Sequence, residues 1–250
     1  MINHNKKWKI IASSVAGPSH INRGEKCEDH YNYFSKNDNF IAIISDGAGS
    51  ADFGKIGARI ICDSFIDIFK KTNLKNAEEK IIKAVKLARK RAILHRMNKT
   101  KSSGNLSDFS ATLLGVMMFK DKGYFFHIGD GAAIGFNHGE FNNFKTSMPH
   151  NGNYSNETFF YTMKDWQKHL RITPIEDFNR IVLMSDGVSN FAFKKKTKKL
   201  EDNFIIPIND FLSKTKLKTK ARAALKNTLN NKEAQKLSSD DKTLLWARYE

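Results

Sequence analysis

Cysteine is scarce in this chain of 250 residues, which contains only Cys27 and Cys62. Two cysteines make neither a disulfide framework nor a zinc cluster, so the fold must depend on a hydrophobic core. Long apolar runs are missing too, and the longest are far shorter than the roughly 20 residues that span a bilayer. The basic N-terminus lacks the long apolar segment of a signal peptide. We therefore expect a cytoplasmic protein with no membrane partner.

Acidic residues are few relative to basic ones. The 42 lysines and arginines outnumber 26 aspartates and glutamates, which gives a formal net charge of +16. A protein with such a charge could bind nucleic acid, a membrane surface or an acidic partner. The lysines are spread along the chain, however, and this favours a solvated basic surface. The densest cluster, FKKKTKKLED, has no interleaved aromatic residues, so it does not indicate a surface that stacks single-stranded nucleic acid.

The hydrophobic pattern predicts an α+β protein with antiparallel sheets. No internal repeat or long linker interrupts it. Short apolar runs predict strands at residues 8–16, 39–45, 112–119, 124–130, 132–136, 157–163, 181–186 and 242–249. Apolar residues at helical spacing predict helices at residues 53–71, 76–99, 203–214 and 216–236. Residues 145–156 are expected to form a loop.

Three of the predicted strands run into an Asp-Gly pair, at Asp46, Asp130 and Asp186. Asp-Gly favours a tight hairpin turn, and this explanation suits Asp130, because the next strand follows at once. It suits the other two poorly, because no matching strand follows them. Carboxylates at strand ends can instead hold a hard cation such as Mg²⁺ or Mn²⁺. Two acidic pairs, in CEDH and SSDD, flank the series.

The motifs around these acidic residues resemble the metal-dependent Ser/Thr protein phosphatases of type 2C (PPM), nearest to a divergent bacterial branch. They cover about residues 10–248 in the family's order. The matching motifs are SHINRGEKCEDHY, IISDGAGSADFGKIGA, FSATLLGVMM, YFFHIGDGAAI, LMSDGVSNF and SSDDKTLLWA. The resemblance implies one domain over residues 1–250, built as a four-layer αββα sandwich of two antiparallel sheets flanked by helix pairs. It also implies hydrolysis of phosphoserine and phosphothreonine in proteins by a water or hydroxide that two Mg²⁺ or Mn²⁺ ions share.

The resemblance also assigns ligands at one end of the sandwich. Asp46 would bridge both ions. The Gly47 carbonyl and Glu28 would complete the shell of one ion, and Asp186 and Asp240 would hold the other. This arrangement agrees with general chemistry, since two cations can activate a shared water and clamp phosphoryl oxygens.

Other positions are carried over less directly. Asp130 matches a residue that joins a third, weaker ion in many relatives, and Asp29 would support the ligand shell from behind. The last motif is usually Asp-Asn, whereas here it is Asp240-Asp241, so either aspartate could be the ligand. Asn190 stands where an aspartate often helps to bind the third ion.

The chain departs from the family at the phosphate-binding arginine. Many relatives place it four residues before the metal-binding glutamate, where this chain has Gly24. Arg23 and His20 are nearby and are the candidates to replace it.

Two alternatives to an active phosphatase remain open. One is a pseudophosphatase or regulatory binding module of the same fold, favoured by Gly24 and Asn190, and the other is a basic nucleic-acid-binding protein. As an enzyme, the chain would act on a phosphoprotein, with a cognate Ser/Thr kinase as an expected partner and the monomer as the expected state.

Overall fold

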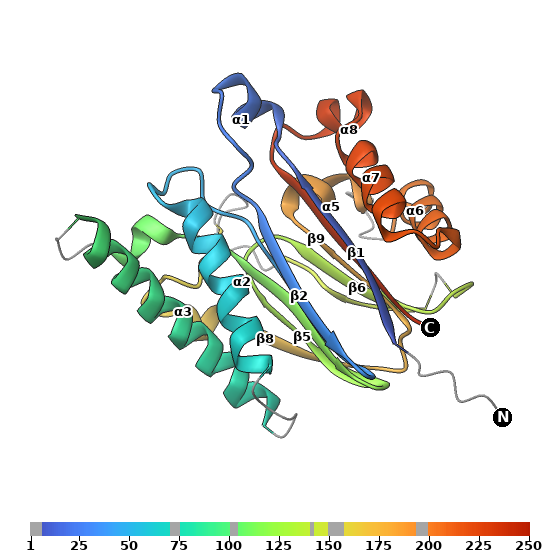
Figure 1. Cartoon of the computed structure of the whole chain (residues 1–250), viewed down its shortest axis with the longest axis horizontal. Helices are drawn as coiled ribbons and strands as arrows, with labels where there is room; N and C mark the ends of the chain where they lie inside the picture. Colours follow the sequence, from blue (N-terminus) through green and yellow to red (C-terminus); the bar gives the residue numbers. More distant parts are fainter. Residues whose placement is uncertain (1–6, 71–75, 101–104, 141–142, 150–157, 194–199) are drawn as a thin grey trace.

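The computed structural model describes residues 7–70, 76–100, 105–140, 143–149, 158–193 and 200–250. These residues form two five-stranded sheets that pack face to face, with helices on both outer faces (Figure 1). All neighbouring strands within each sheet are antiparallel. The predicted α+β sandwich with four layers is therefore confirmed.

The first sheet has the strand order β1-β10-β9-β6-β7. Its strands are β1 (Trp8–Val15), β10 (Lys242–Tyr249), β9 (Arg180–Met184), β6 (Ala132–Phe136) and β7 (Phe144–Ser147). The second sheet has the order β2-β3-β4-β5-β8. Its strands are β2 (His30–Lys36), β3 (Asn39–Ser45), β4 (Leu113–Phe119), β5 (Lys122–Ile128) and β8 (Arg171–Glu176).

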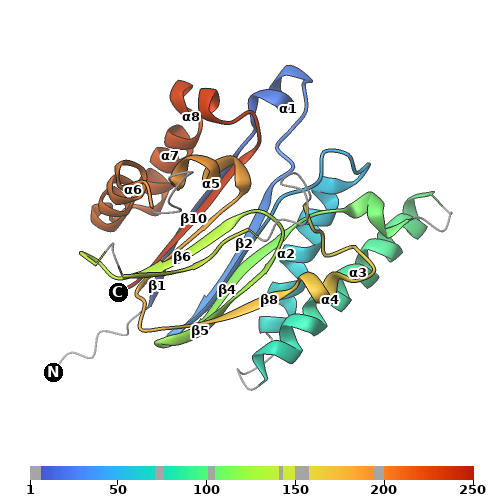
Figure 2. The same cartoon turned by 180° about the vertical axis from the view of Figure 1, so that it is seen from behind.

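Helices cover the outer face of each sheet (Figures 1 and 2). The second sheet carries α2 (Gly54–Lys70) and α3 (Ala77–Thr100). The first sheet carries α5 (Asp186–Ala192), α6 (Asp202–Lys214), α7 (Lys218–Leu229) and α8 (Lys232–Leu237). Three short helices lie in the connections: α1 (Pro18–Asn22), the 3₁₀ helix η1 (Leu106–Phe109) and α4 (Trp166–His169).

Strand β3 has an uninterrupted apolar run because of its position in the sandwich. Its side chains alternate between the two faces of the sheet, and both faces are buried. Ile41 and Ile43 pack against the helices, whereas Phe40, Ala42 and Ile44 pack against the other sheet. A strand in the middle of four layers therefore needs apolar residues at every position.

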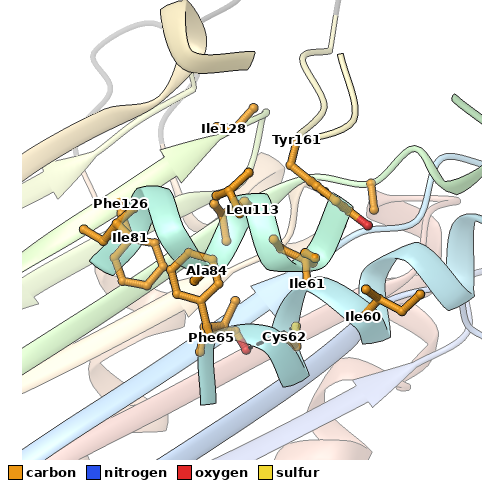
Figure 3. Close-up of a cluster of buried hydrophobic side chains, with 14 of the residues drawn as sticks. Ile60, Ile61, Cys62, Phe65, Ile81, Ala84, Leu113, Phe126, Ile128 and Tyr161 are labelled. Atoms are coloured by element: carbon orange, nitrogen blue, oxygen red, sulfur yellow. Dashed lines mark hydrogen bonds between the residues drawn. The ribbon is translucent and has the colours of Figure 1, made fainter. Parts of the chain in front are cut away.

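The core under α2 and α3 follows from the helical spacing of apolar residues. Ile61, Cys62 and Phe65 of α2 are buried against the second sheet (Figure 3). The Phe65 ring stacks on Phe126 of β5 at a centroid distance of 4.7 Å. Cys62 thus belongs to the core, and both cysteines are free thiols.

Most of the predicted elements are confirmed, but several sequence expectations were wrong. Residues 158–163 form no strand, and the predicted helix at 216–236 is divided into α7 and α8. Strand β7 occupies the start of the predicted loop at 145–156, of which residues 150–156 lie outside the described part. Among the described helices, none combines the length and hydrophobicity that a bilayer span requires.

The predicted hairpin at Asp130-Gly131 is also wrong. Strand β5 belongs to the second sheet and β6 to the first, so the turn carries the chain across the sandwich. Gly129 adopts a φ of +123°, which side-chain-bearing residues rarely reach. The crossing places Asp130 between the two sheets' ends, where a hairpin would have left it at the edge of one.

Candidate functional site

A cavity of about 350 Å³ opens at the end of the sandwich where α1 and α8 lie side by side (Figures 1 and 2). Segments from both sheets line it. The aspartates of the three strand-terminal Asp-Gly pairs reach it, and so do both aspartates before the last strand. These residues are Asp46, Asp130, Asp186, Asp240 and Asp241.

Asp46 is fixed where β3 ends. Its backbone N–H donates to the Thr112 hydroxyl oxygen at 2.9 Å, and its carbonyl accepts from the Thr112 N–H at 2.9 Å. Gly47 follows and passes close to the start of α2. A Cβ at Gly47 would lie 2.5 Å from the Gly54 carbonyl carbon, so only glycine fits. The chain therefore continues past Asp46 without a hairpin, as predicted.

Asp186 comes from the other sheet. It follows β9 and is the first residue of α5, and its Oδ1 accepts a hydrogen bond from the Gly187 N–H at 2.6 Å. Its carboxyl group lies near that of Asp46, and its charge is one cause of the raised pKa of Asp46. The sandwich thus brings the ends of β3 and β9 into direct contact.

The acidic groups in this region carry more negative charge than their surroundings balance. Burial, together with Asp29, Asp186 and Asp130, raises the pKa of Asp46 well above its usual value. Burial and the charge of Asp130 and Asp240 raise the pKa of Asp186 to about 6. Lys242 directly follows Asp241 in the sequence, but its ammonium group donates to the backbone carbonyls of Ser238 and Asp240.

Asp29 is buried and is not among the residues that line the cavity, and its supporting role stays a prediction. Burial raises its pKa to about 7, and Asp241 and Asp186 add to the effect. The hydroxyls of Thr243 and Ser185 lie beside it, but neither carboxyl oxygen has a hydrogen bond of standard geometry. Glu28 Oε2 is likewise buried without a hydrogen bond. Buried carboxylate oxygens without donors are suited to a cation.

Asp240 and Asp241 have different environments. Asp241 Oδ1 lies 2.8 Å from the Gly17 N–H nitrogen and 2.8 Å from His20 Nδ1, and its Oδ2 accepts from the Glu28 N–H at 2.5 Å. Burial acts against these hydrogen bonds, but together they lower the pKa of Asp241. The Asp240 carboxylate is exposed in the cavity, and it raises the pKa of Asp186. The geometry therefore favours Asp240 as the open ligand and Asp241 as a scaffold residue.

His20 and Arg23 both line the cavity. His20 Nε2 lies 3.8 Å from Glu25 Oε2 and 3.9 Å from Glu28 Oε2, while its Nδ1 contacts Asp241. The exposed Arg23 side chain pairs with Glu25, with 2.7 Å between Nε and Oε2. Both candidate phosphate-binding groups thus lie at the cavity and are held by carboxylates.

Six residues at the cavity had no assigned role in the sequence: Ser19, Ala48, Gly49, Thr112, Thr158 and Phe160. Thr158 donates a hydrogen bond to Asp130 Oδ2 at 2.7 Å. Thr112 lies in the FSATLLGVMM motif, but nothing in that motif marks it as the residue that holds Asp46. Thr158 and Phe160 follow a segment that lies outside the described residues, and no local pattern identifies them.

The donor set fits a hard divalent cation. It consists of carboxylate and carbonyl oxygens, the ligands that Mg²⁺ and Mn²⁺ prefer. In the described part of the chain, no group of three or more Asp, Glu, His or Cys side chains is already arranged as a coordination shell.

Comparison with known proteins agrees with this architecture. The family model described as protein phosphatase 2C matches residues 16–230. Serine/threonine-protein phosphatase 3 of Escherichia coli K12 is 24% identical to this chain and aligns with 96% of it and 99% of its own length.

Two solved structures share the fold. Stp1 of Staphylococcus aureus, a serine/threonine phosphatase, superimposes with a TM-score of 0.64 at 17% identity, over 97% of this chain and 95% of Stp1. The catalytic domain of the serine/threonine phosphatase PstP, crystallised with two manganese ions, gives 0.63 at 14% identity, over 98% of this chain and 99% of PstP. With the family model matching most of its length, the chain belongs to the protein phosphatase 2C family.

Proposed function

We propose that this chain hydrolyses phosphoserine and phosphothreonine in proteins at the cavity between the two sheets. The observation that carries the proposal is the convergence of Asp46, Asp130, Asp186 and Asp240 on that cavity from separate parts of the chain. Family membership supports a metal-dependent protein phosphatase. The acidic cluster, with buried oxygens that lack donors, gives this chain the means to hold the metal.

The ions would be held by the carboxylates of Asp46, Glu28, Asp186 and Asp240 and by the Gly47 carbonyl. Two such ions, when bound, lower the pKa of a shared water and neutralise the phosphoryl oxygens. Within the chain, Thr112 fixes the backbone of Asp46 through two hydrogen bonds.

Asp241 holds three elements of the site together, because it accepts hydrogen bonds from Gly17, His20 and Glu28. Asp130, bonded to Thr158, is available for a third ion.

The substrate phosphate needs donors from the protein as well as the ions. His20 is fixed in orientation through Nδ1 by Asp241, which leaves Nε2 toward the carboxylates and the cavity. Arg23 lines the cavity and is paired with Glu25 through Nε, which leaves its two terminal nitrogens outside this pair. We assign phosphate binding to these two residues in place of the arginine that Gly24 does not supply.

We propose a cytoplasmic monomer that uses Mg²⁺ or Mn²⁺ and acts with a cognate Ser/Thr kinase. Two free thiols support a reducing compartment. The densest lysine cluster, Lys194 to Lys199, lies outside the described residues, so its part in attracting an acidic phosphoprotein stays a prediction.

The test is hydrolysis of an aryl phosphate and a phosphoserine peptide, with Mn²⁺ and with a chelator, by three proteins. The wild type should be active only with metal, and Asp46→Asn should be inactive. Asp121→Asn, an exposed aspartate in the turn between β4 and β5, should match the wild type. Inactive wild type with normal Mn²⁺ binding would indicate a pseudophosphatase. Tight, salt-sensitive binding of generic DNA would instead support the nucleic-acid alternative.

A further inference from the structure

A second cavity, of about 460 Å³, lies in the helix layer between α6, α7 and α8. Its volume is in the usual range for a binding site. Apolar side chains form most of the lining, among them Phe204, Ile208, Phe211, Leu225, Ala234 and Leu237. We refer to it below as the helical groove. None of these residues lies in the catalytic cavity.

Apolar surface continues beyond the groove itself. Phe211 is 43% exposed and Leu237 is 63% exposed, although both line the groove. A small ligand buried in the groove would leave much of these side chains in water. A helix laid along the groove would cover them, and this is a recurring mode of peptide recognition.

The segment that forms α6, α7 and α8 carries an excess of positive charge. All basic residues between positions 200 and 238 are exposed: Lys214, Lys216, Lys218, Lys220, Arg222, Lys226, Lys232 and Lys236. The acidic residues of the same segment are half as many: Glu201, Asp202, Asp210 and Glu233. Glu233, which lines the groove, is paired with Lys236 at 3.2 Å. An apolar groove formed by helices with a net positive charge is complementary to an acidic amphipathic helix.

Two segments connect the groove to the catalytic cavity. Helix α5 has Asp186 in the catalytic cavity and Phe191 in the groove. The other segment runs from Leu237 in the groove to Asp240 in the catalytic cavity.

The second segment is held by a buried lysine. Lys242 Nζ donates to the Ser238 carbonyl at 2.8 Å, to the Asp240 carbonyl at 2.9 Å and to Gln235 Oε1 at 3.3 Å. One ammonium group therefore ties the end of α8 to the backbone of Asp240. A partner that fixes α8 from the groove would also restrict Asp240.

We propose that the helical groove binds an acidic amphipathic helix of a partner protein, and that this binding changes the affinity of the catalytic cavity for divalent metal. The docking part stands independently, whereas the regulatory part rests on the proposed function. Asp186 and Asp240 are the residues through which the two sites communicate.

The docking part is tested with three probes on the full chain. The first is a labelled peptide of about 18 residues, with leucines at helical spacing and glutamates on the other face. The second has lysine in place of each glutamate, and the third is laurate. The acidic peptide should bind, and Phe211→Glu and Leu237→Glu should weaken it about 10- to 100-fold, as expected for losing one buried apolar anchor. Ile93→Glu, at a 44% exposed position on α3, is the matched control and should not change binding.

Three other outcomes of this experiment would contradict the docking part of the proposal. Equal binding of both peptides would rule out charge complementarity, and binding of laurate alone would indicate a small amphiphile. Failure of the acidic peptide to bind would remove the site. Because the substituted residues are exposed, circular dichroism should show all variants folded.

The regulatory part is tested by calorimetric titration of Mn²⁺ with and without the acidic peptide. Coupling is reciprocal, so the peptide should change the Mn²⁺ dissociation constant, and Mn²⁺ the peptide's, by the same factor, on the order of fivefold or more. Unchanged Mn²⁺ affinity would overturn the coupling and leave docking intact. Asp46→Asn should bind the peptide normally in metal-free buffer, so a failure of the proposed catalytic function is distinguishable from a failure of docking.

Discussion

The carboxyl group of Asp186 lies near that of Asp46 and raises the pKa of Asp46, although the two residues follow strands of different sheets. Two ionised carboxylates in contact repel each other, so one must hold a proton when no cation is present. A divalent ion removes this conflict, because it can bind both groups in their ionised form. Proton and metal therefore compete for the same pair.

Metal should stabilise the folded protein. At a hundred times its dissociation constant, one bound ion contributes about 2.7 kcal/mol. For a domain of this size each kcal/mol moves the melting temperature by roughly 2–4 °C, so we expect a rise of about 5–10 °C with Mn²⁺. Differential scanning calorimetry measures it. Asp46→Asn should lose the shift and Asp121→Asn should keep it. A wild-type melting temperature that changes with neither Mn²⁺ nor Mg²⁺ would contradict the proposed metal site.

Asp240→Asn and Asp241→Asn should have different effects. Asp240 is exposed in the cavity, so its replacement should weaken Mn²⁺ binding at least tenfold and leave the metal-free protein stable. Asp241 is a charged acceptor for three donors, so its replacement should cost about 1.5–3 kcal/mol of folding free energy. Urea unfolding in chelator and Mn²⁺ titration separate the two. The reverse pattern would make Asp241 the ligand.

The stability of the metal-free protein should fall as pH rises. Burial raises the pKa of Asp29 to about 7 and that of Asp186 to about 6, from an ordinary value near 3.8. A raised pKa in the folded state means that folding binds a proton between the two values. The stabilisation is complete below about pH 4 and is lost as pH rises through 6 to 7, by about 1.4 kcal/mol per pH unit for each such group.

Urea unfolding in chelator at pH 5 and pH 7.5 measures this loss. Asp29→Asn should make the dependence shallower, because it removes one of the titrating carboxyls. With saturating Mn²⁺ the trend should reverse, since metal binds the ionised carboxylates. Metal-free protein that is more stable at pH 7.5 than at pH 5 would contradict the account.

Arg23 should contribute to phosphate binding. Because a charged hydrogen bond is worth roughly 1.5–3 kcal/mol, Arg23→Ala should lower kcat/KM about 10- to 100-fold and leave Mn²⁺ affinity unchanged. Glu25→Gln should release Arg23 from its 2.7 Å pair and lower KM. If Arg23→Ala has no effect and His20→Ala reduces kcat/KM, His20 is the main phosphate-binding group. If neither has an effect, both assignments are wrong.

Introducing the family's arginine at Gly24 is a less direct test. Gly24 has a φ of +69°, a left-handed conformation that costs a side-chain-bearing residue roughly 1 kcal/mol or more. Nothing within 4 Å would obstruct a Cβ there, so the cost lies in the backbone alone. Gly24→Ala is therefore the necessary control for Gly24→Arg, with melting temperature measured beside KM.

The spacing of apolar residues was sufficient to predict those helices and strands whose apolar residues are the ones buried in the core. The helical spacing around Ile61 and Phe65 predicted α2, and the apolar run ending in Trp246 predicted β10. Strand β8, RITPIE, was missed because it has an edge position with mostly half-buried or exposed side chains. Residues 158–163 were misassigned because they are mostly apolar without forming a strand. Phe159 and Tyr161 pack against the core from an irregular segment, and Phe160 lines the cavity.

The acidic residues of the site could be found from the chain alone, since each stands beside a strand end and the motifs keep a family order. Their roles depended on long-range contacts. Asp240 and Asp241 are neighbours in sequence and both line the cavity, yet Asp240 is exposed and Asp241 is held by Gly17, His20 and Glu28. Whether Asp-Gly at Asp130 closes a hairpin or crosses between sheets likewise depends on which strands β5 and β6 pair with. Strand pairing and hydrogen-bond partners join residues far apart along the chain, so only the packed sandwich specifies them.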